Sequence, residues 1–291
     1  MRQDRESVLR VKVYYEVGKQ RGQRATVVYT VGKVLEGAAV SHTAPIPEDA
    51  DLYICWGHRN TEDMYAAFAR GTVIVCLDRG YFDATRFQRF SISIQGVHGL
   101  SMPVDGTLAL PPRPKPELQP WKTGGEYVQI AAPGWSDTHW RTPSARLPLS
   151  WMDDLVADAG RAFDKPVKIH WHPRACPEEM RGSPPLEDTF DETYVSVAYQ
   201  SLSAVQTVVA GVPSVALHKR CIAWPVAADT FERITPDREA WIHDLSHREY
   251  AMADDAEMAL AAEYIMRGYW QAKERGPIAG NWLEHGIREP I

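Results

Sequence analysis

Two histidines and an arginine lie close together in the second half of the chain, in the run His170-Trp171-His172-Pro173-Arg174. Residues two apart on a strand face the same side, so His170 and His172 share a face, and Arg174 follows just beyond the strand. Imidazole and guanidinium groups bind phosphate through charge-assisted hydrogen bonds, so the run predicts a phosphate site. A metal site is disfavoured, because no Cys, Asp or Glu nearby completes a ligand set. The other alternative is one buried histidine beside a surface arginine.

A second anion site is predicted where the run Gln200-Ser201-Leu202-Ser203 opens a helix that ends at Gly211. Ser201 is a suitable N-cap residue, and the N–H groups of a first helical turn attract anions. A plain capped helix is the alternative, but the nearby histidine run favours phosphate. Three further residues are assigned to the same ligand: Gln200, Ser203 and Gly134.

Asp78 is the leading candidate for acid–base chemistry, because it follows an apolar strand-like run. A carboxylate at a strand end can take a proton from a bound hydroxyl group. It can equally cap the next helix or pair with Arg79. Glu16, at the end of the first expected strand, and His58 are rival bases. The residues expected to contact the hydroxyl-bearing molecule lie in the same turns: Arg59, Arg79 and Tyr81.

Apolar runs and turn residues predict alternating strands and helices along the chain. Strands are expected at 11–16, 51–56, 72–77, 127–131, 166–171, 193–199 and 213–217. Helices are expected at 25–35, 61–70, from 150 onward, 202–210 and 239–274, and a strand remains possible at 25–35 because of its β-branched residues. In the last helix one face is expected to carry Met258, Ala261, Ala262, Ile265 and Trp270.

This alternation predicts an α/β protein with two Rossmann-like, doubly wound domains, each with a parallel sheet covered on both faces. Residues 111–124 contain five prolines and are expected to be extended and stiff. The expected division is an N-terminal domain at 1–113, a linker at 114–124, and a C-terminal domain with a helical tail at 125–291. Ligands bind beyond the carboxyl ends of strands in such sheets. This rule selects the turns at 57–60, 78–81, 134–137, 170–174 and 200–203.

Composition limits the class of protein. The 291 residues are 44% hydrophobic and 24% charged, which is typical of a folded globular chain. No apolar run is long enough to cross a bilayer and no signal segment opens the chain, so a cytoplasmic protein without membrane partners is expected. The four cysteines form no CxxC pair, so neither a zinc cluster nor a structural disulfide is expected. Neither GxGxxG nor GxxxxGK[ST] occurs.

Charge is distributed unevenly. The net charge is −6, but residues 1–33 contain eight basic and three acidic residues, which is a local charge of +5. Such a stretch is either a solvated basic surface or a patch that meets a polyanion such as DNA.

The whole pattern resembles the GT-B class of glycosyltransferases, which have two Rossmann-like halves and bind the nucleotide in the second. The His172-Pro173 pair resembles the His-Pro element of capsule and sialic-acid type transferases, which lies on the donor phosphate. A Ser-rich helix start followed by Ala-Gly-Val-Pro, here at 210–213, recurs in that class. The run at 221–226 follows where the segment beside base and sugar is expected. The order of the runs 13–16, 56–60, 78–81 and 222–225 also resembles small phage-borne glycosyltransferase-like proteins.

This resemblance implies a nucleotide-sugar donor, with a nucleoside diphosphate sugar favoured and no obligatory metal. The first hypothesis is a phage enzyme in the host cytoplasm that glycosylates a hydroxymethylated pyrimidine in DNA, which requires access to a flipped base. The net charge of −6 opposes this hypothesis. One alternative is a transferase for a surface polysaccharide or small glycan. The other is a non-catalytic nucleotide-binding protein of the same fold.

Overall fold

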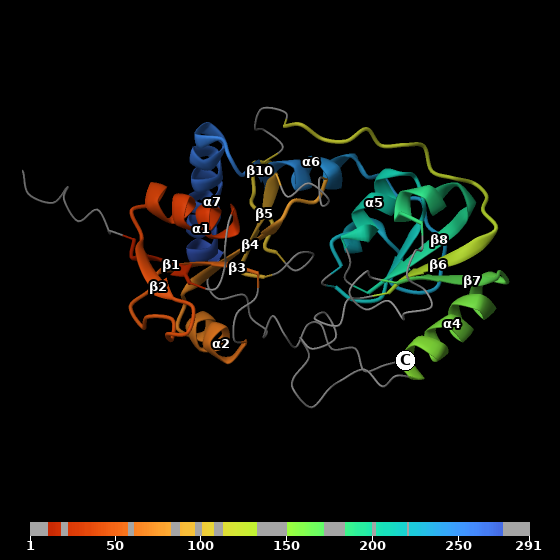
Figure 1. Cartoon of the computed structure of the whole chain (residues 1–291), viewed down its shortest axis with the longest axis horizontal. Helices are drawn as coiled ribbons and strands as arrows, with labels where there is room; N and C mark the ends of the chain where they lie inside the picture. The colour runs from red at the N-terminus through yellow and green to blue at the C-terminus, as the bar shows by residue number, and fades with distance from the viewer. Residues whose placement is uncertain are drawn as a thin grey trace, which may run out of the picture. The chain divides into compact units, whose positions relative to one another are not determined.

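The computed structural model describes residues 11–18, 23–57, 61–82, 88–96, 101–107, 113–132, 150–171, 184–199, 202–219 and 221–275. Contacts divide the chain into two compact units (Figure 1). The first unit draws on the ranges 1–97, 101–111 and 244–281, and the second on 98–100, 112–243 and 282–291.

The first unit is built on a six-stranded sheet with the order β10-β5-β4-β3-β1-β2. Its strands are β1 (Val13–Val17), β2 (Ala38–Ser41), β3 (Leu52–Trp56), β4 (Val73–Arg79), β5 (Arg89–Ile94) and β10 (Glu249–Ala251). Strands β1 to β4 are parallel, whereas β5 is antiparallel to β4 and to β10. The prediction of a fully parallel sheet is therefore wrong here. Fewer than a dozen residues separate β4 from β5, and that length is too short for a helical crossover.

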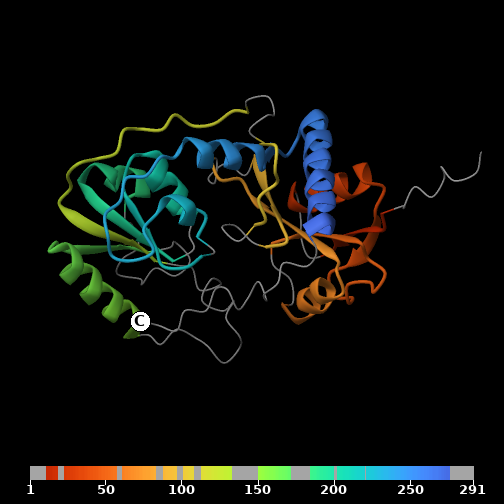
Figure 2. The ribbon, with the colours of Figure 1, turned by 180° about the vertical axis from the view of Figure 1, so that it is seen from behind.

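Helices cover both faces of this sheet. The helix α1 (Gln23–Val34) connects β1 to β2, and α2 (Thr61–Ala69) connects β3 to β4. Because the two crossovers run in opposite directions along the sheet and both are right-handed, the helices lie on opposite faces. Figures 1 and 2 show α1 together with α7 (Asp255–Arg275) on one face and α2 on the other. The α1 and α7 face buries the main apolar core, which includes Tyr15, Ile54 and Ile265.

The second unit has four parallel strands in the order β7-β6-β8-β9. They are β6 (Tyr127–Ala131), β7 (Val167–His170), β8 (Thr193–Ala198) and β9 (Ser214–Ala216). The helix α4 (Ser150–Phe163) packs on β6 and β7, and α5 (Ser203–Val209) packs on β8 and β9. The four strands are all parallel, as predicted for this half. Two short 3-10 helices complete the unit: η4 (Leu186–Glu192) and η5 (Trp224–Val226).

The proline-rich segment is extended, as predicted, but it lies along the second unit. The N–H of Gln119 donates to the carbonyl of Val209 at 2.9 Å, and the N–H of Lys122 donates to that of Gly211 at 2.7 Å. These bonds fasten the segment to the end of α5 and to the turn after it. It therefore belongs to the second unit.

The C-terminal region differs from the single predicted helix at 239–274. The structure has α6 (Glu239–His247), then β10, then α7. Asp254 starts a new helix here, because its carboxylate accepts the N–H of Ala256 at 2.9 Å. Most of the predicted apolar face of α7 is buried, but Trp270 is 47% exposed, and the neighbouring Tyr269 is buried.

The division of the chain also differs from the one expected. The helix α7 was assigned to the C-terminal domain, yet it packs against α1, β4, β5 and β10 of the first unit. The apolar face of a first sheet made of residues 13–94 needs this helix as its cover. No helix among the residues described is long and apolar enough to cross a membrane.

Candidate functional site

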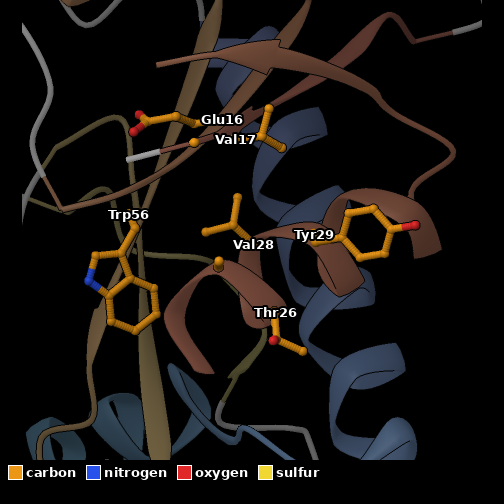
Figure 3. A pocket seen from close by; sticks show the side chains of 8 residues that line it. Glu16, Val17, Thr26, Val28, Tyr29 and Trp56 are labelled. Carbon is orange, nitrogen blue, oxygen red and sulfur yellow. The ribbon is translucent and has the colours of Figure 1, made fainter. Parts of the chain in front are cut away.

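The carboxyl edge of the first sheet contains a pocket at the point where the strand order reverses, between β1 and β3. From β1 the chain crosses to β2 on one side and then returns to β3 on the other, so a crevice forms beyond β1 and β3. A pocket of about 300 Å³ lies at this place. Figure 3 shows its wall residues, which come from the ends of β1 and β3 and from the start of α1: Glu16, Val17, Thr26, Val28, Tyr29 and Trp56.

This pocket is mostly apolar and has one carboxylate. Glu16 is only 6% exposed, although glutamate is one of the charged residue types. The guanidinium carbon of Arg24 lies 5.8 Å from the centroid of the Trp56 ring, in cation–π range. Apolar walls with a few polar groups are the usual lining of a small-molecule site. Of the two proposed bases that the structure describes, Glu16 lines this pocket and Asp78 does not.

Asp78 lies at the same edge, two strands away. Tyr15 pairs with Ile54 and Cys55 pairs with Cys76, so Glu16 is level with Cys76 and Asp78 is two residues further along. Paired residues of parallel strands face the same side, so Glu16 and Asp78 share one face of the sheet. Two strand spacings separate them laterally, which is about 10 Å. Asp78 also accepts the N–H of Arg79 at 2.7 Å.

The turn after Asp78 is held inside the first unit. Tyr81 is 1% exposed, and burial raises the pKa of its hydroxyl. The Tyr81 ring is therefore part of the packing in this structure, and not on the surface where an acceptor contact was expected. Arg79 remains partly exposed at the end of β4. His58 and Arg59, the other residues proposed for this edge, lie outside the described residues.

His170 ends β7 on the carboxyl edge of the second sheet. Burial lowers the pKa of its imidazole, and the charge of Glu187 opposes that shift. Burial therefore favours the uncharged ring, which can still donate one N–H to an anion. His172 and Arg174, the other members of the predicted phosphate site, lie beyond the part of the chain that the structure describes, as do Gly134 and Gln200.

The helix α5 begins one residue later than predicted. The helix begins at Ser203, and the preceding cap position is Leu202, whose side chain makes no capping hydrogen bond. Ser201 itself is outside the described residues. Ser203 lies in the first turn, as expected, but α5 has only seven residues and therefore a small dipole.

The sequence did not point to three aromatic side chains at the end of this second sheet. The rings of Tyr199 and His218, which follow β8 and β9, lie 5.0 Å apart, and the ring of Trp151 meets Tyr199 edge-on at 5.8 Å. Tyr199 and His218 are both buried. Tyr199 directly follows β8 and His218 comes two residues after the end of β9, and these positions beyond apolar strands are the signal that could have identified them.

No group of three or more His, Cys, Asp or Glu residues is arranged to hold a metal ion in the described ranges.

No protein-family model and no curated protein matches this chain. Among solved structures, the chain is similar to "Thermosulfurimonas dismutans KpsC, beta Kdo 2,7 transferase", with 10% identity over 86% of this chain and 98% of that chain and a TM-score of 0.52. The beta Kdo 2,4 transferase of the same KpsC matches 83% of this chain and 92% of its own, with 12% identity and a TM-score of 0.48. The first likeness shows a shared fold that spans nearly all of that transferase chain.

Proposed function

We propose that the protein is a glycosyltransferase that moves a sugar from a nucleotide-sugar donor to a hydroxyl group. The observation that carries the proposal is the pair of carboxylates, Glu16 and Asp78, on one face and one edge of the first sheet, of which Glu16 lines a pocket. The fold shared with the KpsC beta Kdo 2,7 transferase supports the same reaction class.

The donor is proposed to bind at the carboxyl edge of the second sheet. His170 lies at this edge, and the sequence places His172, Arg174, Gln200, Ser201, Ser203 and Gly134 in the same turns. These groups would offset the negative charge that develops on the leaving nucleotide. A nucleoside diphosphate sugar suits the two predicted anion sites, and no metal is required for this arrangement.

The acceptor is proposed to be a sugar hydroxyl of a polysaccharide or small glycan. The apolar pocket with Trp56, Tyr29 and one carboxylate fits a ring that has a hydrophobic face and hydroxyl groups at its rim. The Kdo transferase activity of the KpsC structure favours this acceptor over a hydroxymethylated base in DNA. The net charge of −6 also opposes DNA.

The proposed chemistry uses the two carboxylates differently. Asp78 takes the proton of the acceptor hydroxyl while the hydroxyl oxygen bonds to the anomeric carbon of the donor sugar. The bond between that carbon and the phosphate oxygen breaks, and the nucleotide leaves with its electron pair. Glu16 holds and orients the acceptor in the pocket. Arg59 and Arg79 are proposed to contact the acceptor at its charged or hydroxylated rim.

The test is a matrix of donors and acceptors. The purified protein is incubated with nucleoside diphosphate and nucleoside monophosphate sugars, each with oligosaccharide acceptors and with hydroxymethylated DNA. Mass spectrometry then detects the added sugar. A gain on an oligosaccharide supports the proposal, whereas a gain on DNA alone would restore the phage DNA hypothesis. Thermal stabilisation by a nucleotide without transfer to any acceptor would indicate a non-catalytic binding protein.

The Asp78→Asn variant should bind the donor with an unchanged Kd, but its kcat should fall by about 100-fold or more, because general-base catalysis contributes 10²–10⁴-fold. The Glu16→Gln variant should mainly raise KM for the acceptor. Thermal shift with donor and initial-rate kinetics separate these effects. If Glu16→Gln abolishes transfer while Asp78→Asn retains it, the two roles are reversed.

A further inference from the structure

Glu249 is a buried carboxylate that meets the turn after Asp78. Its side chain is 0% exposed, and it lies on β10 at the edge of the first sheet. Its carboxylate accepts the backbone N–H of Tyr81 and, at 3.0 Å, the N–H of Phe82. The Arg89 Nε donates to the same carboxylate at 2.6 Å. One side chain thus ties together β5, β10 and the turn that follows β4.

The turn is shaped to admit this carboxylate. A Cβ atom on Gly80 would lie 2.9 Å from the Cβ of Arg89 and 3.0 Å from the Cδ of Glu249. The contact with Arg89 is shorter than real Cβ atoms show, and the contact with Glu249 is tighter than most. The glycine of the Asp78–Tyr81 run is therefore explained by its close packing against Arg89 of β5, with Glu249 beside it.

The backbone on either side of Gly80 is fixed as well. The N–H of Gly80 donates to the carbonyl of Arg89 at 3.0 Å. The Ser91 hydroxyl donates to the carbonyl of Arg79 at 2.8 Å. The N–H of Arg79 in turn donates to the Asp78 carboxylate at 2.7 Å. The orientation of Asp78 is thus linked to Glu249 by a short series of backbone bonds.

Burying Glu249 is costly for a charged group. Burial raises the pKa of its carboxyl, while the two backbone N–H groups and Arg89 act in the opposite direction. An apolar side chain at this position would deprive the N–H groups of Tyr81 and Phe82 and the guanidinium of Arg89 of their acceptor. The carboxylate fixes both N–H groups at once, and with them the conformation of the turn.

We propose that Glu249 is a positioning residue for the transfer reaction: it fixes the 79–82 turn and through it the orientation of the Asp78 carboxylate. This inference rests on the proposed function, with Asp78 as base. It gives the C-terminal segment a role at the catalytic edge, since Glu249 is 168 residues away from Tyr81 in sequence.

The experiment compares Glu249→Gln with a matched control, Glu257→Gln. Glu257 accepts the N–H of Ala251, at the other end of the same strand, at 3.2 Å. The Glu249→Gln amide keeps the shape but brings a donor toward two N–H groups. We expect its kcat to fall by about 10- to 100-fold with KM for the donor within twofold, because misplacing a catalytic group by about 1 Å costs this much. The control should keep the wild-type kcat.

Two further measurements separate positioning from stability. Hydrogen exchange should quicken at the amides of Tyr81 and Phe82 in Glu249→Gln and stay slow in Glu257→Gln. In the Asp78→Asn background, Glu249→Gln should cause no further loss of kcat, because it acts through Asp78. Faster exchange at the turn with a wild-type kcat overturns this inference alone. An additive loss in the double variant also overturns it. No transfer by the wild-type protein with any donor overturns the proposed function instead.

Discussion

The protein surroundings of His170 and the ligand proposed for it favour different protonation states of the imidazole. Burial favours the neutral imidazole, whereas a phosphate favours the imidazolium. The folded chain therefore holds fewer protons on this group than the unfolded chain does. Its contribution to stability is complete above the unfolded pKa of about 6.5 and is lost as the pH falls through the lower folded pKa.

Nucleotide binding should have the opposite pH dependence. We expect the affinity for a nucleoside diphosphate to rise as the pH falls from 8 to 6, by up to about tenfold per pH unit, since binding takes up a proton. In His170→Gln this dependence should disappear. Calorimetry in two buffers of different ionisation enthalpy counts the protons taken up. An unchanged proton uptake in His170→Gln would remove this residue from the donor site.

At the residue scale, the sequence identified Glu16 and Asp78 because each lies near the carboxyl end of an apolar strand. It could not rank them, since the pocket that distinguishes them depends on how α1 packs beside Trp56. It also assigned Tyr81 to contact with the acceptor, because a turn residue next to glycine gives no sign of burial by contacts with a strand 168 residues away. Long-range contacts of this kind leave no local pattern.

At the scale of single elements, Gly211 lies where the end of α5 contacts the proline-rich segment. Its φ is +77°, and a Cβ there would lie 2.1 Å from the carbonyl oxygen of Pro120. Gly71 follows α2 with φ +86° but has nothing within 4 Å. Substitutions at the two glycines therefore distinguish two effects on stability. Both would strain the backbone, but only a side chain at Gly211 would also collide with the proline-rich segment.

Gly71→Ala should therefore cost about 1 kcal/mol in the free energy of unfolding, from left-handed strain alone. Gly211→Ala should cost about 3 kcal/mol, because the Pro120 carbonyl must also move. Urea denaturation of both variants measures the difference. Equal costs would mean that the proline-rich segment does not contribute to the stability of the second unit.

Predictions at the element scale were confirmed where the pattern was long or strongly apolar. Strands β3, β4, β6 and β8 and helices α1, α2 and α5 lie within a few residues of their expected ranges. The edge strand β2 was missed, because three of its four residues are exposed and give no apolar run. The strand β10 was missed because three residues inside a helical pattern pair with β5 only in the folded chain.

At the scale of the whole molecule, α7 covers the first sheet although it comes last in sequence. It contributes eight buried residues: Met258, Ala261, Ala262, Tyr264, Ile265, Gly268, Tyr269 and Ala272. Burying this face stabilises the first unit by about 10 kcal/mol, which is comparable with the entire stability of a typical domain.

A chain that ends at Asp254 should therefore lose the folded first unit and keep the second. Hydrogen exchange should become fast in peptides from β3 and β4 and remain slow in peptides from β6 and β8. This contrast separates loss of one unit from general unfolding. Persistent protection of β3 and β4 would show that the sheet is stable without its C-terminal helix.

The late position of β10 and α7 also sets an order of events during synthesis. Residues 112–243, the largest part of the second unit, emerge before the segment that completes the first sheet, so the second sheet can form while the first is incomplete. At 5–20 residues per second, the 168 residues between Tyr81 and Glu249 take about 10–30 s to translate. During that time the open edge of β5 and the apolar face beneath α7 are exposed to other nascent chains. The N-terminal part of this protein is thus the part expected to depend on chaperones in the cell.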